Sequence, residues 1–140
     1  MVAPMPYFLA KTDPETYAVS QFRQDKRTTW DGVTNAQAVA VIRSMRPGDR
    51  VFVYHSQGQA AIVGLAKVAS EPRQDANDPK SWVVDMEFLK TLEPPTTLAE
   101  VKLSGLFADW ALVRQSRLST MAAPEAFVEW MRARYKTARL

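Results

Sequence analysis

The chain has no cysteine and a single histidine, His55, among its 140 residues. These scarcities exclude disulfide bonds, cysteine nucleophiles, thiolate-bound metals and metal sites built from several histidines. Oxygen ligation is the remaining option for a metal ion, and the sequence holds no acidic loop of the EF-hand type. We therefore expect a protein that carries no transition metal.

Long apolar runs are also missing, and those present are too short to span a bilayer. The first residues, MVAPMPYFLAK, lack the basic start and the apolar stretch of a signal peptide, so we expect a cytoplasmic protein. Hydrophobic residues make up 46% of the chain and charged residues 24%, which argues against disorder and against a coiled coil. The length is that of one ordinary domain, covering residues 1–140.

The chain has only a small excess of positive charge, because it holds 18 basic and 15 acidic residues and its net charge is +3. Residues 1–108 hold 12 basic and 12 acidic side chains, whereas residues 109–140 hold six and three. A basic end on a neutral body suits a partner that carries phosphate, such as nucleic acid. The alternative, which charge alone favours, is a solvated C-terminal helix whose arginines complement the helix dipole.

The first third of the chain predicts one strand and two helical segments. Residues 6–11 (PYFLAK) are typical of a short strand, and residues 21–24 of a single helical turn. A buried helix is predicted over residues 35–45, where Thr34 and Gln37 have the spacing of a capping box.

The middle of the chain predicts antiparallel strands. Residues 50–56 (RVFVYHS) are apolar on both faces, which is typical of an interior strand. Residues 60–68 return as the second arm of a hairpin, where Gly64 indicates a bulge, a bend or a close backbone approach. A surface loop over residues 71–80 leads to a strand over residues 82–90.

The last part predicts a helix, a strand and a second helix. Thr97 and Glu100 form a capping box for a short helix that ends at Leu103. Residues 110–113 are interpreted as one more strand, and Pro124 begins the final helix. The helix spacing predicts one inward stripe, made of Phe127, Trp130, Met131, Arg134 and Tyr135.

This order of elements predicts an α+β domain with a small, curled mixed sheet or barrel and helices at its ends. Regular alternation of strands and helices is missing, which argues against a doubly wound fold.

Four segments, KTDP (11–14), WDGVTNAQA (30–38), VFVYHS (51–56) and LVRQSRLS (112–119), follow one another along the chain. Together they resemble the EVE domain family of the PUA-like superfamily, and the resemblance runs from Tyr7 to the final helix. It implies a compact PUA-like barrel flanked by short helices, with a pocket where the motifs meet. Family members are associated with reading modified bases, chiefly methylated or oxidised cytosine in DNA. The implied partner is therefore nucleic acid, DNA rather than RNA, bound without a cofactor.

The chain departs from the usual family pattern at a few positions. Thr34 stands where arginine is usual, Val39 and Ala40 replace arginine and asparagine, and Phe8 stands where many members have tryptophan.

An extruded base needs an aromatic wall and fixed polar groups. Trp30 is the candidate wall, and Gly32 lies in a turn that lets the backbone approach the base. Asn35 offers a donor and an acceptor for the base edge. The structural alternatives are a core tryptophan and a polar residue at the start of a helix.

Three residues near strand ends are weighed in the same way. Ser56 is predicted as a polar contact at the pocket rim. Lys11 either orients a pocket carboxylate, contacts phosphate or is a solvated strand end. His55 is more typical of a hydrogen-bonded core residue than of a ligand-binding group.

A polar cluster of Arg114, Arg117 and Ser119 is the candidate phosphate clamp, because guanidinium groups bind phosphate in bidentate fashion. The alternative is a salt bridge from this cluster to Asp31 or Asp13. The basic residues of the final helix that would follow the nucleic-acid backbone are Arg132, Arg134 and Lys136.

Two other functions stay open. Relatives in the ASCH group of the PUA-like superfamily include hydrolases of modified nucleosides that use a lysine, a hydroxyl residue and an acid. Lys11, Thr12 and Asp13 supply these types, but consecutive residues of an extended strand point in alternate directions. A plain protein-interaction module is equally compatible with the composition.

Overall fold

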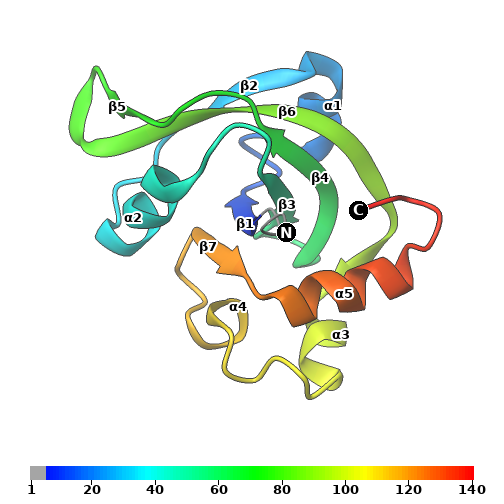
Figure 1. Cartoon of the computed structure of the whole chain (residues 1–140). Coiled ribbons are helices and arrows are strands. Elements are labelled where there is room, and N and C mark those ends of the chain that lie inside the picture. Colours follow the sequence, from blue (N-terminus) through cyan, green and yellow to red (C-terminus); the bar gives the residue numbers. More distant parts are fainter. Residues whose placement is uncertain (1–5) are drawn as a thin grey trace, which may run out of the picture.

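A computed structural model describes residues 6–140 (Figure 1). Residues 1–5 lie outside the described residues. They belong to the N-terminal segment whose sequence led us to expect no signal peptide. The described chain contains a mixed sheet of seven strands and five short helices, which confirms the predicted α+β class. Within this part of the chain, no helix combines the length and the apolar character that crossing a bilayer requires.

The sheet is curled but open. Its strands are hydrogen-bonded in the order β2-β6-β4-β3-β1-β7, with β5 pairing on β6. Among the strands of the described residues, β1 and β3 form the one parallel pair. Among residues 6–140 the order ends at β2 and β7, so the expected barrel is a curved sheet whose ends are not joined by a ladder. The strand bounds are β1 (Tyr7–Thr12), β2 (Arg27–Trp30), β3 (Arg50–His55), β4 (Ala61–Val68), β5 (Arg73–Asp75), β6 (Asp78–Thr97) and β7 (Thr120–Ala123).

The helices are short and lie around the curled sheet. In Figure 1, α3, α4 and α5 gather at one end of the sheet, whereas α1 lies near β2 and β6 at the other. Their bounds are α1 (Val19–Asp25), α2 (Ala36–Ser44), α3 (Leu98–Leu103), α4 (Ala111–Arg114) and α5 (Glu125–Arg134).

The two predicted capping boxes have different outcomes. Thr97 accepts from the Glu100 backbone N–H while the Glu100 carboxylate accepts from the Thr97 backbone N–H, so this box is confirmed. The box predicted at Thr34 is wrong, because Asn35 is the N-cap of α2. The Asn35 side-chain oxygen accepts the backbone N–H groups of residues 37 and 38.

The strand predicted over residues 110–113 is also wrong, since this segment is the single-turn helix α4. Trp110 is the N-cap of α4, is 9% exposed, and donates its indole N–H to the Ala122 carbonyl at 2.9 Å. The loop predicted over residues 71–80 contains β5. The strand predicted to end at residue 90 continues as β6 to Thr97, through the cis peptide bond between residues 93 and 94.

The predicted inward stripe of α5 is correct at Phe127, Met131 and Tyr135, all of which are buried. It is wrong at Arg134, which is exposed, and Trp130 is only half-buried.

Phe127 is the centre of an aromatic core. Phe127 is fully buried, and its ring lies 4.4 to 5.8 Å, centroid to centroid, from Phe52, Phe107, Trp110 and Trp130. Full burial of such a side chain contributes about 1.5–3 kcal/mol. This packing fixes α4 and α5 against one end of the sheet.

Of the alternatives that the sequence left open at Gly64, the structure shows a bulge, because the pairing of β4 with β6 shifts register between Ile62 and Gly64. A Cβ at Gly64 would lie 3.0 Å from Cγ2 of Val19 and 3.2 Å from the Lys90 carbonyl oxygen. The absence of a side chain therefore lets the first turn of α1 pack directly on β4.

Candidate functional site

A cleft of about 320 Å³ opens between β2 and the carboxyl end of β1. β7 pairs with β1 only as far as Ala10, so Lys11 and Thr12 lie beyond that ladder. The cleft therefore occupies the place where the curled sheet stays open, and we call it the seam cleft. It is lined by Lys11, Thr12, Thr16, Tyr17, Thr28, Thr29, Trp30 and Asp31.

Trp30 is a core tryptophan, the structural alternative that the sequence offered, and it also borders the seam cleft. Its side chain is only 6% exposed, and its ring packs against Phe22 with a centroid distance of 6.0 Å. The same residue lines the seam cleft. The aromatic wall of the cleft is thus a core residue, held in place by the packing behind it.

The Lys11 side chain is held by contacts within the protein, so it is not the solvated strand end that the sequence left as one alternative. Its ammonium donates to the Ser116 carbonyl oxygen at 3.0 Å and lies 5.5 Å from the centroid of the Tyr54 ring. Burial lowers the pKa of Lys11 below its ordinary value. The ammonium therefore stands between the seam cleft and the loop that follows α4.

The segment between β1 and α1 forms one side of the cleft and is held by side chains of the sheet. The Thr12 hydroxyl donates to the Tyr17 carbonyl at 2.9 Å. His55 Nε2 accepts the backbone N–H of Val19 at 3.0 Å, and burial lowers the pKa of His55. His55 is thus a hydrogen-bonded structural residue, as predicted.

Ser56 and Gly32 lie near the cleft without lining it. The backbone N–H of Ser56 donates to the Thr12 carbonyl at 3.0 Å, and its hydroxyl donates to the same oxygen at 3.4 Å. Gly32 follows Asp31 with a φ of 77°, and no atom within 4 Å would meet a Cβ there. Its conformation favours glycine and leaves the backbone open to a ligand.

A second hollow, of about 310 Å³, lies between the start of α2 and the loop after α4, and we call it the arginine hollow. Its lining includes Asn35, Arg114, Ser116 and Arg117. Ser116 lines this hollow, and its carbonyl oxygen accepts from Lys11, which lines the seam cleft, so the two hollows are neighbours. The structure therefore brings Arg114, Arg117 and Asn35 together, beside the cleft rather than inside it.

The contacts made by the residues at and near the arginine hollow differ from the predicted alternatives. Arg114 pairs with Asp109 at 3.0 Å, instead of Asp31 or Asp13, and both partners are well exposed. The Asn35 oxygen is occupied by the α2 cap, which leaves the amide NH₂ as its donor. The Ser119 carbonyl accepts the Lys11 backbone N–H at 2.8 Å.

The basic residues of α5 lie elsewhere, because Figure 1 shows α5 at the opposite end of the sheet from α1 and β2. Arg132 forms an ion pair with Glu129, and Arg134 forms one with Glu100. Arg134 also stacks at 4.9 Å from the centroid of the Trp130 ring. Both arginines therefore already have an acidic partner within the chain.

The residue types of a hydrolase do not converge on one point. The Lys11 ammonium contacts Ser116, the Thr12 hydroxyl contacts Tyr17, and the Asp13 carboxylate accepts the backbone N–H of Glu15 at 2.9 Å. Each group makes its own local contact. Within residues 6–140, no three carboxylate or histidine side chains come together in a way that would hold a metal ion.

Sequence reasoning missed the hydroxyl groups of β2 and the residue that holds them. Thr28 and Thr29 line the seam cleft, and Thr29 donates to the Asp85 carboxylate at 2.8 Å. Burial alone would raise the pKa of Asp85, but hydrogen bonds from Thr29, Arg73 and Arg27 outweigh it and lower the pKa. Residues 27–29 are polar in succession and only Trp30 is apolar, so the segment has no alternating pattern that would have indicated a strand.

Comparison with known proteins identifies the family of this chain. The EVE domain family model matches residues 6–134, and the chain belongs to the EVE domain family. Thymocyte nuclear protein 1 of Rattus norvegicus is 32% identical over 124 residues, which cover 69% of this chain and 55% of that protein. The chain thus spans about half the length of the curated relatives it matches.

Solved structures share the fold. An NMR structure of Rpa0253 from Rhodopseudomonas palustris has 35% sequence identity and a TM-score of 0.84, covering 90% of each chain. Human THYN1 protein in complex with 5-methylcytosine-containing DNA has 22% identity and a TM-score of 0.85, covering 94% of this chain and 98% of that one. At that identity the likeness to the human protein concerns the fold.

Proposed function

We propose that this chain binds nucleic acid, DNA rather than RNA, and accepts a modified cytosine-type base in the seam cleft. The observation that carries the proposal is the placement of Trp30, Lys11 and the β2 threonines around one cleft in a member of the EVE domain family. A member of the same fold has been solved with 5-methylcytosine-containing DNA, which supports the choice of ligand.

The seam cleft supplies the groups that a flipped base requires. Trp30 offers a ring held rigidly by Phe22, and base–aromatic stacking contributes about 1–3 kcal/mol per base. The Thr28 hydroxyl, on the same face of β2 as Trp30, and the Lys11 ammonium offer polar groups for the base edge. The volume of about 320 Å³ lies at the small end of ligand pockets, which suits a single base.

The arginine hollow is the phosphate site of this proposal. Arg114 and Arg117 present guanidinium groups beside the cleft, and exposed pairs such as Arg114 with Asp109 contribute little and exchange readily for phosphate. The other predicted contacts with the nucleic acid, around the seam cleft and the arginine hollow, remain Gly32, Asn35, Ser56 and Ser119. Arg132 and Arg134 of α5, and Lys136 just after it, remain a secondary prediction for the nucleic-acid backbone.

The experiment compares oligonucleotides that differ at one position, carrying cytosine, 5-methylcytosine or an oxidised 5-methylcytosine, in single- and double-stranded form. We expect tighter binding to a modified base. Trp30→Phe keeps an aromatic core residue but reduces the stacking area, so the preference should shrink while the protein stays folded. Trp82→Phe makes the same change outside the cleft and is the matched control. Equal affinity of the wild-type protein for all three bases contradicts the proposal.

A further inference from the structure

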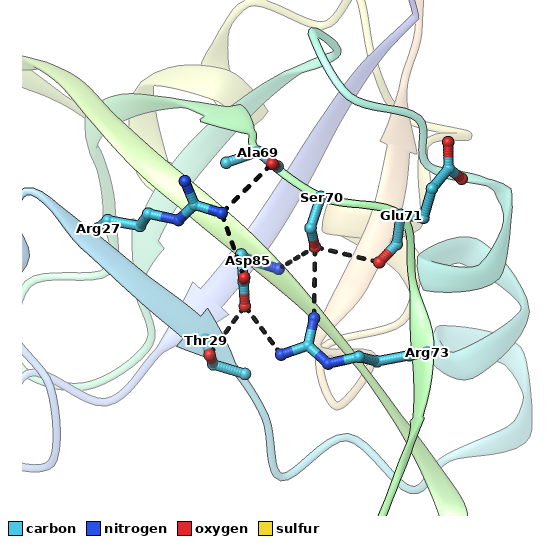
Figure 2. A network of polar contacts seen from close by, with 7 residues as sticks. All are labelled: Arg27, Thr29, Ala69, Ser70, Glu71, Arg73 and Asp85. Atoms are coloured by element: carbon cyan, nitrogen blue, oxygen red, sulfur yellow. Dashed lines mark hydrogen bonds and ion pairs between the residues drawn. The ribbon is translucent and has the colours of Figure 1, made fainter.

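The residues of β2 alternate between the two faces of the sheet, because the register of β2 with β6 is regular from Arg27 to Trp30. Arg27 and Thr29 point to one face, where both contact the Asp85 carboxylate (Figure 2). Thr28 and Trp30 point to the other face, and both line the seam cleft. A group that meets a ligand at the Trp30 ring therefore has to lie on the Thr28 side of β2.

Tyr17 is a second aromatic residue on this side, and it comes from the segment between β1 and α1. Tyr17 and Trp30 both line the seam cleft, and the centroid of each ring lies 6.0 Å from the centroid of the Phe22 ring. Tyr17 is half-buried, whereas Trp30 is only 6% exposed. Stacking on a base needs an accessible ring face, and Tyr17 has the larger exposed share of its surface.

The Tyr17 ring is held in place from its backbone to its hydroxyl group. The backbone N–H donates to the Asp13 carbonyl at 2.8 Å, and the backbone carbonyl accepts the Thr12 hydroxyl at 2.9 Å. The ring packs on Phe22, and its hydroxyl donates to Oδ2 of Asp25 at 2.8 Å. A ring that is fixed at both ends loses little further freedom when a ligand stacks on it.

Asp25 lies where a helix disfavours an acidic side chain, because it is the last residue of α1 and stands at the negative end of the helix dipole. Within the described part of the chain, none of the ion pairs involves Asp25. Its two carboxylate oxygens accept instead from the Tyr17 hydroxyl and from Nε2 of Gln21, the latter at 2.9 Å. The hydrogen bond to Tyr17 gives this unfavourably placed carboxylate a role.

Lys26 carries backbone strain at the same place. It is the one residue between α1 and β2, and its φ of 68° and ψ of −34° are disfavoured for a residue with a side chain. The backbone N–H of Phe88 donates to its carbonyl at 2.8 Å, which holds this conformation. The sharp turn lets Asp25 and Thr28 both hydrogen-bond the Tyr17 hydroxyl. Strained residues of this kind concentrate at ligand-binding sites.

We propose that Tyr17 is a second ligand-stacking residue of the seam cleft and that Asp25 is a positioning residue that fixes its ring. This inference rests on the proposed function, since it takes the ligand to be a base in that cleft. Every nucleobase has a π-face, so stacking on Tyr17 adds affinity whatever group the base carries. Tyr17 therefore governs whether a base enters the cleft, and not which modification is preferred.

The test uses two short single-stranded oligonucleotides that carry either 5-methylcytosine or an abasic tetrahydrofuran at one position. The ratio of their affinities, the base-to-abasic ratio, measures what the base contributes. Tyr17→Leu should reduce this ratio about tenfold, the equivalent of about 1.4 kcal/mol, and leave the preference for 5-methylcytosine over cytosine unchanged. Tyr7→Leu removes a half-buried tyrosine at the other end of β1 and is the matched control. An unchanged base-to-abasic ratio in Tyr17→Leu overturns the inference.

A double-mutant cycle tests the positioning role of Asp25. Asp25→Ala and Tyr17→Phe remove the same hydrogen bond and keep the ring, so each should lower the base-to-abasic ratio by about threefold. The double variant should lower the ratio no further than either single variant. Glu71→Ala removes an exposed carboxylate from the loop after β4 and should leave the ratio unchanged. Two effects that multiply in the double variant overturn the positioning role.

A ligand-free measurement tests the same contact. Burial raises the pKa of the Tyr17 phenol, a hydrogen bond with Thr28 opposes this shift, and Asp25 raises the pKa further. An NMR titration of Tyr17 should therefore give a lower pKa in Asp25→Ala and an unchanged pKa in Glu71→Ala. An unchanged pKa in Asp25→Ala overturns the contact whatever the protein binds.

The wild-type protein separates this inference from the proposed function. If it binds cytosine and 5-methylcytosine equally while Tyr17→Leu still lowers the base-to-abasic ratio, the inference is supported and the proposed function is contradicted. If it prefers 5-methylcytosine while Tyr17→Leu leaves that ratio unchanged, the proposed function is supported and the inference is overturned.

Discussion

His55 accepts the backbone N–H of Val19 at 3.0 Å, across 36 positions of the chain, and thereby caps α1 from the sheet. The residue at the N-cap position, Ala18, has no side-chain group for this purpose. The imidazole must be neutral at Nε2 to accept, which agrees with the lowering of the pKa of His55 by burial.

Stability should therefore depend on the charge of His55. Because the folded pKa lies below the ordinary value of about 6.5, the unfolded chain binds more protons just below that pH. The contribution is fully present above pH 6.5 and is lost as the pH falls toward the folded pKa. Urea midpoints measured between pH 7.5 and about 5 should fall with acidification, and His55→Gln should flatten this slope. Identical slopes would contradict the prediction.

Trp30→Ala should lower the free energy of unfolding by about 3–5 kcal/mol, because it removes a side chain that is 6% exposed and packs on Phe22. Urea denaturation measures this loss. Trp82→Ala, at a half-buried position, is the comparison and should cost less. A loss below about 1 kcal/mol for Trp30→Ala would show that the ring is not part of the core.

Salt dependence distinguishes the two basic regions. The double variant Arg114→Gln with Arg117→Gln should reduce the slope of log K against log salt by about two, at about 0.9 for each phosphate contact. Arg132→Gln with Arg134→Gln removes the same charge from the secondary backbone path. Because these two arginines also pair with residues 129 and 100, the slope should fall by less than in the first variant. A larger fall of the slope in the α5 variant than in the Arg114 and Arg117 variant would place the nucleic acid along α5.

Gly64→Ala should cost about 1–3 kcal/mol of stability, because the new methyl group would lie 3.0 Å from Cγ2 of Val19 and 3.2 Å from the Lys90 oxygen. Adding Val19→Ala should recover part of this loss by removing the side-chain contact. Thermal melting of the single and double variants provides the measurement. Strict additivity would show that the Val19 contact is not the cause.

The correct predictions rest on local patterns. The apolar run at β3, the hairpin with β4 and the capping box at Thr97 each involve residues close together in the sequence. The pattern at α4 misled because a buried tryptophan and a few aliphatic residues satisfy a strand or a helical turn equally well. At α2, Thr34 and Asn35 are both good caps, and the backbone geometry selects Asn35.

The candidate site was predictable only in part, because its contacts join distant segments. Trp30 and Lys11 stood out in the sequence, whereas the bond from Thr29 to Asp85 spans 56 positions. The partner of Arg134 was invisible for the same reason, because it is a carboxylate 34 positions away. The partner of Arg132 is a local one, Glu129 in the preceding helical turn. Charge counted along the chain therefore overstated the basic character of α5.

The opening between β1 and β2 has a practical consequence. Lys11 and Thr29 stand on walls that are four places apart in the strand order β2-β6-β4-β3-β1, so a molecule bound to both acts as a cross-brace. A ligand that binds in this opening should therefore raise the free energy of unfolding, by about 2.7 kcal/mol when its concentration is a hundredfold above the dissociation constant. Heating the protein with a panel of nucleosides and short oligonucleotides would rank occupants without a label.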